Sequence, residues 1–358
     1  MDPINLFEYE PLARERIDPV SWEYFQSGAN DEVTLRENRL AYERIRLRPR
    51  MLAGVATPDT RTIALGAPLS MPILVAPMAY HKLAHPEGEA AMARGAGAAG
   101  TLMCVSTMAT TSLEDVARAA SGPLWFQLYV YRDRDVTVSL VRRAEQAGYR
   151  ALVVTVDLPA LGRREADVRN GFGLPPHLSV ANFRGELAEE QRVAPGESGL
   201  AAYATAQHDP SLTWEAIDWI ASITTLPVLV KGILTAEDAA LAVAHGVAGI
   251  IVSNHGGRQL DSAMATIEAL PEVVETVAGR CEVYVDGGVR RGTDALKALA
   301  LGARAVLLGR PALWALAVDG AEGVERALRL LHEELKLAMI LSGRPTLASI
   351  DRSLVKLP

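Results

Sequence analysis

Residues 227–253 read PVLVKGILTAEDAALAVAHGVAGIIVS, and they contain the unit from which the fold can be inferred. It contains two apolar runs, at 227–231 and 248–253, and between them a helix is predicted over 236–244 with Thr235 as its N-cap. Near-continuous Val, Ile and Leu, rather than alternation with polar residues, is typical of strands that are covered on both faces, as in parallel sheets. The stretch therefore predicts a strand–helix–strand unit of a parallel α/β fold.

The same unit recurs along most of the chain. Eight apolar runs are predicted as strands, at 73–77, 101–106, 124–129, 151–157, 227–231, 248–253, 282–286 and 305–309. Helices are predicted between several of them, at 87–99, 113–120, 135–147, 236–244 and 293–300. Eight consecutive units of similar length favour closure into a (β/α)8 TIM barrel over an open, doubly wound sheet.

The rest of the chain is predicted to extend this barrel, so that residues 1–358 form a single domain. The segment before the first strand, residues 1–70, is predicted to be helical, and residues 323–358 to form a helix and a tail. Within the first segment, helices are predicted at 19–27 and 32–42. The longest connection, at 170–214, follows the fourth strand and is rich in Gly, Pro and Ala. A connection of this length usually forms an active-site lid or a mobile segment.

The composition excludes several classes of protein. The formal net charge is −7, from 36 Lys and Arg against 43 Asp and Glu, which argues against general nucleic-acid binding or a basic membrane anchor. Cys104 and Cys281 are too few for a disulfide framework. The sequence shows neither a secretory signal nor an apolar run of the roughly 18 residues that cross a bilayer. We therefore expect a cytoplasmic protein without nucleic-acid or membrane partners.

In a barrel of this kind the catalytic residues lie at the C-terminal ends of the strands. The predicted ends carry many polar and ionisable residues: Ser106, Gln127, Tyr129, Thr155, Asp157, Lys231, Ser253, Asp286 and Arg310. A rim with a purely structural role would not be expected to gather so many of these groups. The set as a whole predicts an active site at this end of the barrel.

The most informative motif is SNHGGRQLD, at residues 253–261, directly after the sixth predicted strand. Histidine can accept a proton near neutral pH, and arginine can bind a carboxylate through two hydrogen bonds. The two glycines between His255 and Arg258 allow the backbone to approach a ligand closely. The alternative is a surface loop with a capping histidine, but the position at a strand end favours a catalytic pair. Asp157 is expected either to orient a protonated His255 or to cap a helix.

Two glycine-rich turns follow the last two predicted strands. They read DGGVRRG at 286–292 and LLGR at 307–310. Glycines with an arginine at these positions form the usual phosphate site of such barrels, built from backbone amides and a helix N-terminus. The alternative is that the glycines only form tight turns.

Other signals are weaker or are excluded. Lys231 follows an otherwise apolar run and is interpreted as a Schiff-base nucleophile or as a cation that faces an electron-rich cofactor. The GAGAAG run at 95–100 ends a predicted helix and precedes a strand, the reverse of the order in dinucleotide-binding folds. The histidines show no metal-ligand spacing, so no metal site is expected.

Several motifs occur together and in a family order: WEYFQSGAND, LVAPMAYHKLAHPEGE, STMATTSLED, WFQLYVYRD, VDLPALGRREADVRNGF, SNHGGRQLD and DGGVRRGTD. With them the chain resembles the FMN-dependent L-2-hydroxy acid oxidases and dehydrogenases, the group that contains glycolate oxidase, lactate oxidase, mandelate dehydrogenase and hydroxymandelate oxidase. The resemblance implies FMN as cofactor, a small 2-hydroxy acid as substrate, and O2 or another electron acceptor. It also implies a homotetramer.

The resemblance implies roles for individual residues. FMN contacts correspond to Pro77, Met78, Ala79, Ser106, Gln127, Thr155, Lys231 and Ser253, and contacts to its phosphate to Asp286, Gly287, Gly288, Arg290, Gly309 and Arg310. Substrate contacts correspond to Tyr24, Tyr129, Arg164, His255 and Arg258. Met108 stands where glycolate oxidases have a tryptophan, and with Leu161 it is expected to shape the pocket for the substrate's side chain.

The expected function is oxidation of an L-2-hydroxy acid to the 2-oxo acid, with O2 as acceptor and H2O2 as product. In that reaction His255 would take a proton, Asp157 would orient it, Tyr129 would hydrogen-bond near the hydroxyl, and Arg258 with Arg164 would hold the carboxylate. The alternatives are a dehydrogenase that uses a quinone or another acceptor, and a different flavin-dependent barrel such as an isomerase or a nucleotide dehydrogenase. A catalytically silent FMN-binding barrel is a further alternative. Aliphatic acids such as lactate and aryl acids such as mandelate both fit the sequence.

Overall fold

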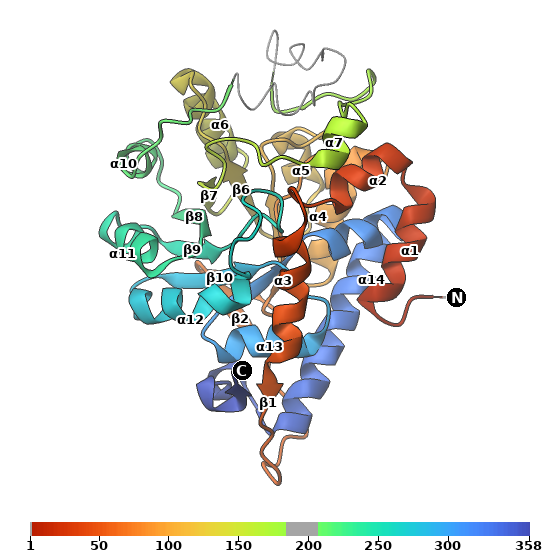
Figure 1. Ribbon diagram of the computed structural model, residues 1–358, viewed down its shortest axis with the longest axis vertical. Helices are drawn as coiled ribbons and strands as arrows, with labels where there is room; N and C mark the ends of the chain where they lie inside the picture. The colour runs from red at the N-terminus through yellow and green to blue at the C-terminus, as the bar shows by residue number, and fades with distance from the viewer. Residues whose placement is uncertain (1, 184–206) are drawn as a thin grey trace.

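The computed structural model describes residues 2–183 and 207–358, and eight parallel strands in it close into a barrel (Figure 1). The strands are β4 (Ile73–Val75), β5 (Met103–Val105), β6 (Leu124–Leu128), β7 (Leu152–Thr155), β8 (Val228–Ile233), β9 (Gly249–Val252), β10 (Glu282–Asp286) and β11 (Ala305–Leu308). Each strand pairs with the next along the chain, and β11 pairs with β4 through Val306 and Ile73. The ring is therefore closed, which confirms the predicted (β/α)8 barrel and excludes the open sheet.

The interior of the barrel is a packed core. Its buried residues include Leu74, Cys104, Trp125, Leu229 and Tyr284, which come from different strands. Their neighbours in sequence point outward, toward the surrounding helices, because successive side chains in a strand face opposite ways. Both faces of the strands are thus covered and mostly apolar, which is why the sequence showed continuous apolar runs rather than alternation.

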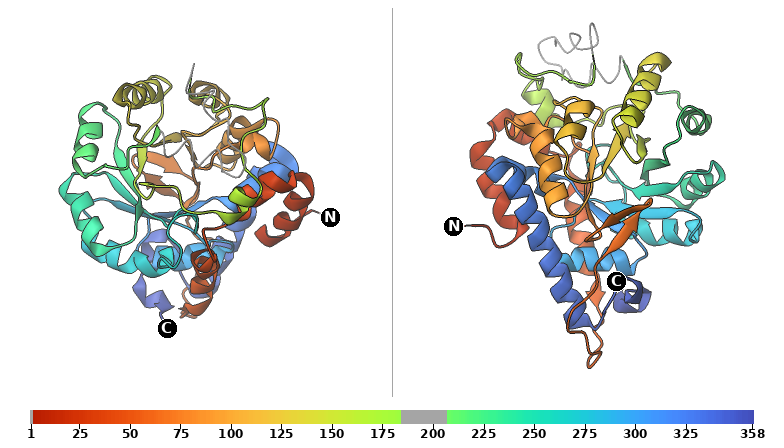
Figure 2. Two further views of the ribbon diagram at one scale, coloured as in Figure 1. Left: turned by 45° about the horizontal axis from the view of Figure 1, so that its top comes forward. Right: turned by 180° about the vertical axis from the view of Figure 1, so that it is seen from behind.

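The helices surround the strands, as the views in Figure 2 show. Those that follow barrel strands are α4 (Gly88–Ala98), α5 (Leu113–Ala119), α6 (Arg134–Gln146), α7 (Glu165–Arg169), α10 (Glu215–Ser222), α11 (Ala236–Ala244), α12 (Thr266–Val277), α13 (Gly292–Ala300) and α14 (Arg310–Ser342). The five predicted helices between strands are confirmed within one residue at each end, and the predicted Thr235 cap of α11 accepts a hydrogen bond from the amide of Asp238. Helix α12 was not predicted, and it contains Pro271, a residue that ordinarily interrupts helices.

The N-terminal segment covers one side of the barrel. Its helices are α1 (Leu6–Arg16), α2 (Pro19–Gln26) and α3 (Val33–Arg44). The second and third were predicted, whereas α1, which contains Pro11, was not. Helix α1 packs against α14, α3 against α12, and α2 against α7, so the N-terminal segment reaches the mouth of the barrel.

Four short strands lie outside the barrel. Strand β1 (Arg46–Leu47) pairs with β12 (Val355–Lys356), and β2 (Thr62–Ala64) pairs with β3 (Ala67–Leu69), both antiparallel. The first pair joins the N-terminal segment to the C-terminal end of the chain. The sequence predicted neither pair.

Two predicted boundaries are wrong. Lys231 was predicted to end its strand, but β8 continues to Ile233. The pairing is irregular between Lys231 and Ile233, where Gly232 has a φ of 117°, a value that glycine adopts readily and other residues rarely do. The C-terminal helix was predicted to begin at residue 323. Helix α14 begins at Arg310 instead, directly after β11, and it is interrupted at Asp319 and Gly320, which have non-helical backbone angles.

The connection predicted to be a lid, at 170–214, is described only at its two ends, since residues 184–206 lie outside the described residues. On one side Phe172 and Phe183 are buried, and on the other a bridge joins His208 to Tyr131. Both described ends of the connection therefore pack onto the body of the protein. No helix in 2–183 or 207–358 is long and apolar enough to cross a membrane.

Candidate active site

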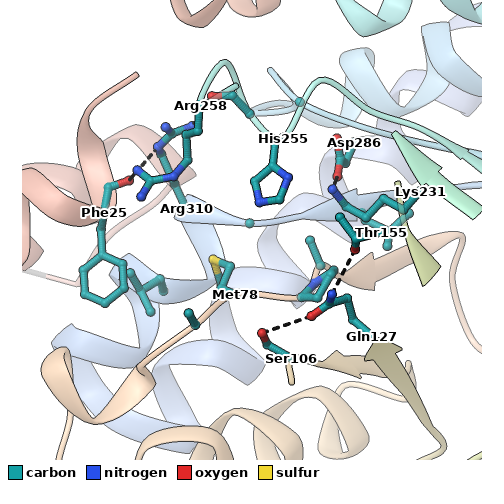
Figure 3. Close-up of a pocket in the computed structure, with 18 of the residues that line it drawn as sticks. Phe25, Met78, Ser106, Gln127, Thr155, Lys231, His255, Arg258, Asp286 and Arg310 are labelled. Atoms are coloured by element: carbon teal, nitrogen blue, oxygen red, sulfur yellow. Dashed lines mark hydrogen bonds and ion pairs between the residues drawn. The ribbon is translucent and has the colours of Figure 1, made fainter. Parts of the chain in front are cut away.

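A pocket opens at the C-terminal ends of the barrel strands (Figure 3). The pocket and its open mouth enclose about 1350 Å³ of empty space. It is lined by all but two of the residues singled out from the sequence, namely Tyr24, Pro77, Met78, Ala79, Ser106, Met108, Gln127, Tyr129, Thr155, Leu161, Arg164, Lys231, His255, Arg258, Asp286, Gly287, Gly288, Arg290, Gly309 and Arg310. The two exceptions, Asp157 and Ser253, each form a hydrogen bond with a residue that lines the pocket.

On one side of the pocket Lys231 is held in its charged form. Its Nζ donates to Oγ of Ser253 at 2.8 Å and lies 3.3 Å from Oδ2 of Asp286. Burial lowers the pKa of Lys231, but the carboxylates of Asp286 and Asp157 outweigh burial and hold this pKa above its ordinary value. A Schiff-base nucleophile must be a neutral amine. The structure therefore favours the interpretation of Lys231 as a fixed cation.

Next to Lys231 a buried amide links three strands. Oε1 of Gln127 accepts hydrogen bonds from Oγ of Ser106 at 3.2 Å and from the amide of Thr107 at 3.1 Å. Its Nε2 donates to Oγ1 of Thr155 at 3.0 Å (Figure 3). These contacts fix which end of the Gln127 amide is donor and which is acceptor. They give the floor of the pocket a defined strip of polar groups.

The imidazole of His255 points into the pocket between Arg258 and Lys231 (Figure 3). Its Nδ1 lies 2.9 Å from Oδ1 of Asp157. Burial raises the pKa of Asp157, but the nearby imidazole and Lys231 outweigh burial and hold it below its ordinary value. Because Asp157 is ionised, Nδ1 carries the hydrogen and donates it, and the lone pair of Nε2 remains available.

The protonation state of His255 suits a base. Burial, opposed by Asp157 but reinforced by the charges of Lys231 and Arg164, lowers the pKa of His255 below its ordinary value. The imidazole is therefore neutral at neutral pH and can accept a proton at Nε2. The carboxylate of Asp157 would then stabilise the imidazolium, so the structure favours the orienting role of Asp157 over a helix cap.

The loop that carries His255 has an unusual backbone. His255, Gly256 and Gly257 have φ values of 57°, 67° and 76°, three left-handed residues in a row. A Cβ atom on Gly257 would lie 2.6 Å from the backbone nitrogen of Leu35 in α3. Only glycine therefore allows the loop to pack against the N-terminal segment.

Asn38 joins α3 to the same loop. The side-chain amides of Asn38 and Asn254 exchange two hydrogen bonds, each of 2.8 Å. Oδ1 of Asn254 also accepts from the amide of Gly257 at 3.1 Å, which fixes the turn. Asn38 lines the pocket and was not singled out from the sequence, because nothing in the helical pattern around it separates it from other polar residues of α3.

Arginines bring an excess of positive charge into the pocket. They are Arg39, Arg164, Arg258, Arg290 and Arg310. Burial, together with the charge of Arg258, lowers the pKa of Arg164 to about 10, and burial with the charges of Arg258 and Arg290 lowers that of Arg310 to about 9. Guanidinium groups whose pKa is lowered by neighbouring guanidinium charges are short of anions, so the pocket is built to receive negatively charged groups.

The two arginines closest to His255 in Figure 3 also hold backbone. Arg258 donates to the carbonyl of Ser27 at 2.9 Å, and its guanidinium lies 4.9 Å from the centre of the Tyr24 ring. Arg310 donates to the carbonyls of Phe25, Gly256 and Ser27. The three side-chain nitrogens of Arg310 already donate to carbonyl oxygens, so in this structure the side chain does not point a free donor toward a phosphate.

The glycine turns that follow β10 and β11 form a cradle in the pocket. Gly287 and Gly288 have φ values of 89° and 78°, and a Cβ atom on Gly288 would lie 1.9 Å from the carbonyl oxygen of Asn38. Helix α14 begins at Arg310 with no side-chain cap. Its second residue, Pro311, has no amide hydrogen, and the amide of Ala312 donates to the carbonyl of Gly309, so the amide of Arg310 is the group that can donate to an anion. The Arg290 guanidinium lies 4.9 Å from the centre of a Trp314 ring, and among the described residues it has only one hydrogen bond, to the carbonyl of Val289 at 2.9 Å.

These features fit FMN. One end of the pocket offers an uncapped helix N-terminus, two glycine turns and Arg290, which suit a phosphate. The other end offers the polar strip of Gln127 and the charged Lys231, which suit the polar edges of a flat ring. Between them Oδ1 of Asp286 is buried and has no hydrogen-bond partner among the described residues, so it can accept from a hydroxyl group.

Several residues that line the pocket were not predicted from the sequence, among them Phe25, Leu35, Asn38, Arg39, Leu158, His208, Val289 and Leu313. His208 is the most informative of these. Its ring stacks on Tyr129, with centroids 4.7 Å apart, and burial lowers the pKa of His208 to about 4. For histidines other than His255, the sequence suggested no role beyond metal binding, which their spacing excludes, and a stacked neutral imidazole has no local sequence signal.

The chain is similar to known proteins over almost its whole length. The model of the FMN-dependent dehydrogenase family matches residues 13–357. Glycolate oxidase 1 of Oryza sativa subsp. indica is 54% identical over 350 residues, which cover 98% of this chain and 94% of the relative. The L-lactate oxidase of Nostoc sp. is 53% identical over 359 residues, 99% of this chain and 98% of the relative. A crystal structure of mandelate oxidase with (S)-4-hydroxymandelic acid matches with a TM-score of 0.95 and 45% identity over 99% of both chains.

Proposed function

The chain belongs to the FMN-dependent dehydrogenase family, and from that membership we propose that it oxidises an L-2-hydroxy acid to the 2-oxo acid, with O2 as acceptor and H2O2 as product. The observation that carries the proposal is a neutral histidine, paired with Asp157, beside Arg164 and Arg258 in a pocket with excess positive charge. A base next to a binding site for a carboxylate is what a 2-hydroxy acid requires. A flavin-dependent isomerase or a nucleotide dehydrogenase would not need that combination.

FMN, when bound, supplies the acceptor for the two electrons that leave the substrate. We propose that Pro77, Met78, Ala79, Ser106, Gln127, Thr155, Lys231 and Ser253 hold its ring, and that Asp286, Gly287, Gly288, Arg290, Gly309 and Arg310, the last through its backbone amide, hold the phosphate-bearing chain. Lys231 would place a fixed positive charge beside the ring, since Asp286 keeps the ammonium protonated. Electrostatic groups that are oriented in advance are often the largest contribution to catalysis.

The protein's own groups would handle the substrate. Arg258 and Arg164, with the phenol of Tyr24, would bind the carboxylate. Nε2 of His255 would take one of the two hydrogens of the substrate as a proton, and Asp157 would stabilise the resulting charge. Tyr129 would hydrogen-bond near the reacting hydroxyl. Burial raises the pKa of Tyr129, so its phenol stays protonated and can donate.

The side chain of the substrate would point toward an apolar wall. Met108, Leu158, Leu161 and His208 line this part of the pocket, and none of the four carries a charge at neutral pH. Met108 is held in place because Tyr131 donates a hydrogen bond to its sulfur at 3.8 Å. We propose that this wall accepts side chains larger than the hydrogen of glycolate, both aliphatic and aryl.

An anaerobic series of substrates tests the proposal. Purified protein with FMN would be mixed with glycolate, L-lactate, longer-chain 2-hydroxy acids and mandelates, and flavin absorbance followed before and after air is readmitted. Bleaching that air reverses, with H2O2 formed, is the expected result. Bleaching that air does not reverse would support the dehydrogenase alternative. Protein that binds FMN but is bleached by none of these acids would contradict the proposed reaction.

We further propose that residues 1–358 act as one domain in a cytoplasmic homotetramer. Large exposed apolar side chains such as Met51, Leu52, Leu337 and Leu341 support association, because oligomers cover such surface. Light scattering after size-exclusion chromatography measures the number of subunits directly. A monomer at micromolar concentration would contradict the tetramer and leave the proposed reaction unaffected.

A further inference from the structure

Two aromatic rings from distant parts of the chain lie flat against each other beside the pocket. The rings of Tyr24, in α2, and Phe172, shortly after α7, have centroids 4.1 Å apart and planes only 5° apart. Both are buried, with 5% and 2% of their surface exposed. Tyr24 lines the pocket, whereas Phe172 does not. Phe172 therefore contacts the site only through its neighbours.

The local sequence explains how Phe172 reaches this position. Helix α7 ends at Arg169, and Gly171 follows with a φ of 55°. The amide of Phe172 donates to the carbonyl of Asp167 at 2.8 Å, and the amide of Gly171 donates to that of Val168 at 3.3 Å. This pair of bonds around a left-handed glycine is a Schellman motif, which turns the chain back across the end of its helix. The turn places Phe172 on Tyr24 rather than in solvent.

A polar contact joins the same two elements at the surface. Nδ2 of Asn170 donates to Oε2 of Glu23 at 2.7 Å. Helices α2 and α7 also pack directly against each other. The stacking of Phe172 on Tyr24 is thus the buried part of a wider contact between the N-terminal segment and the chain after β7.

The other face of the Tyr24 ring is occupied as well. The guanidinium carbon of Arg258 lies 4.9 Å from the ring centroid, and because Phe172 covers one face, Arg258 lies over the other. Phe25 and Tyr80 approach the same ring, with centroids at 5.1 and 5.6 Å. The ring is therefore clamped in one plane between a cation that faces the pocket and an aromatic ring behind it.

We propose that Phe172 is a positioning residue for carboxylate binding. By fixing the plane of the Tyr24 ring, Phe172 sets the direction of the phenol and the position of the Arg258 guanidinium that packs on the ring. In the proposed function, on which this inference rests, these two groups bind the substrate's carboxylate. Without the flat ring of Phe172, Tyr24 can tilt and Arg258 loses the face against which it packs. The loss falls on binding of the carboxylate and not on the proton transfer by His255, because the imidazole of His255 is held by Asp157 rather than by Tyr24.

The variant Phe172→Leu removes the flat ring and keeps an apolar side chain. Oxalate is a suitable probe, because it has two carboxylates, no side chain and no carbon-bound hydrogen to lose. Titration of the FMN-loaded protein, followed by the flavin spectrum, is expected to show a dissociation constant for oxalate raised roughly tenfold. KM for a 2-hydroxy acid should rise by the same factor, and the limiting rate of flavin reduction should stay within about threefold.

Matched variants separate positioning from a general loss of stability. Phe172→Tyr keeps the ring and should restore oxalate binding. Phe183→Leu makes the same change at another buried phenylalanine, one that packs against Tyr131 at 5.3 Å, and should leave oxalate binding unchanged. In a Tyr24→Phe background, Phe172→Leu should raise the dissociation constant for oxalate by a much smaller factor than in the wild type, since the phenol is already absent.

Several results would overturn the proposal. They are an unchanged dissociation constant for oxalate in Phe172→Leu, an equal loss in Phe183→Leu, or a fall in limiting rate without a change in KM. If Phe172→Leu does not retain FMN, Phe172→Met repeats the test with a longer, unbranched side chain, and loss of FMN in both variants would contradict a local role. The oxalate titration does not depend on turnover. A wild type that binds oxalate but oxidises no 2-hydroxy acid would therefore contradict the proposed function and leave the role of Phe172 open to the same measurement.

Discussion

Gly232 lies so close to Asp157 that a Cβ atom built on the glycine would be 2.6 Å from the Cβ of the aspartate and 2.8 Å from its Cγ. The φ of Gly232 is 117°, a value that side chains rarely adopt, at the irregular pairing of β8 between Lys231 and Ile233. One glycine thus borders both the fixed cation and the partner of the proposed base. It also lets β8 continue past Lys231 without displacing Asp157.

Gly232→Ala is therefore expected to damage the site through Asp157. The added methyl must push Asp157 away, which breaks its 2.9 Å contact with Nδ1 of His255. The limiting rate of flavin reduction should fall at least tenfold, and the backbone strain should cost about 1–3 kcal/mol of stability. Stopped-flow reduction and thermal unfolding measure the two effects.

Gly246→Ala is the matched control. Gly246 has a φ of 69°, but nothing lies within 4 Å of the position of its Cβ. It should lose stability from the backbone alone and reduce flavin at the wild-type rate. Equal rates in Gly232→Ala and the wild type would show that contact with Asp157 does not position the base.

His255→Asn tests the base itself. Asparagine tolerates the left-handed backbone at this position, where φ is 57°, better than alanine does. The variant should retain FMN and lose flavin reduction by roughly 10²–10⁴-fold, the usual contribution of a general base. Stopped-flow mixing with substrate measures the loss. His245→Asn, at a histidine paired with Asp218 away from the pocket, should reduce flavin normally, and wild-type bleaching in His255→Asn would contradict the assignment.

The rate of flavin reduction should depend on pH through His255. Its pKa lies below the ordinary value, and a base works only when deprotonated, so the rate should be level near neutral pH and fall as pH drops through that lowered pKa. Asp157 acts to raise the pKa of His255. Asp157→Asn should therefore move the fall to still lower pH and reduce the plateau at least tenfold. A fall that moves to higher pH would contradict this pairing.

Much of this architecture follows from the sequence because of how the barrel is built. Strands such as β9 are buried on both faces, so their apolar runs are unbroken, and residues such as His255 follow directly after them. The residues that were missed act across long separations in the chain. Asn38 pairs with Asn254, Phe172 stacks on Tyr24, and no local pattern records either contact.

The two helices that the sequence did not predict, α1 and α12, have a related cause. Pro11 and Pro271 lie inside α1 and α12, where tertiary packing outweighs the usual cost of proline in a helix. Arg310 is predicted to contact phosphate from its position after a glycine, and that prediction concerns its place in the chain rather than its side-chain partners. Its hydrogen bonds to Phe25 and Ser27 depend on where α2 ends, which the sequence near Arg310 does not record.

Acid should destabilise the fold through buried histidines. Burial lowers the pKa of His332 to about 4, below its value of about 6.5 in the unfolded chain. Nε2 of His332 lies 2.7 Å from Oγ1 of Thr60. The unfolded chain therefore binds more protons in this range, and stability present above pH 6.5 is lost as pH falls toward 4. At pH 5 the loss is about 2 kcal/mol for such a histidine. His332→Gln, which can still donate to Thr60, should show a smaller drop in melting temperature between pH 7 and pH 5, and an equal drop would contradict this account.

Met108→Trp tests the proposed preference for larger substrates. Met108 is buried at 3% exposure on the apolar wall of the pocket, and an indole there would fill space that the substrate's side chain needs. The ratio of kcat/KM for L-lactate or mandelate to that for glycolate should fall by roughly tenfold or more, because apolar pockets discriminate by about that factor for small changes in size. Met108→Leu conserves volume and should keep the wild-type ratio. If tryptophan leaves the ratio unchanged while FMN content and glycolate turnover are normal, the side chain of the substrate does not bind against Met108.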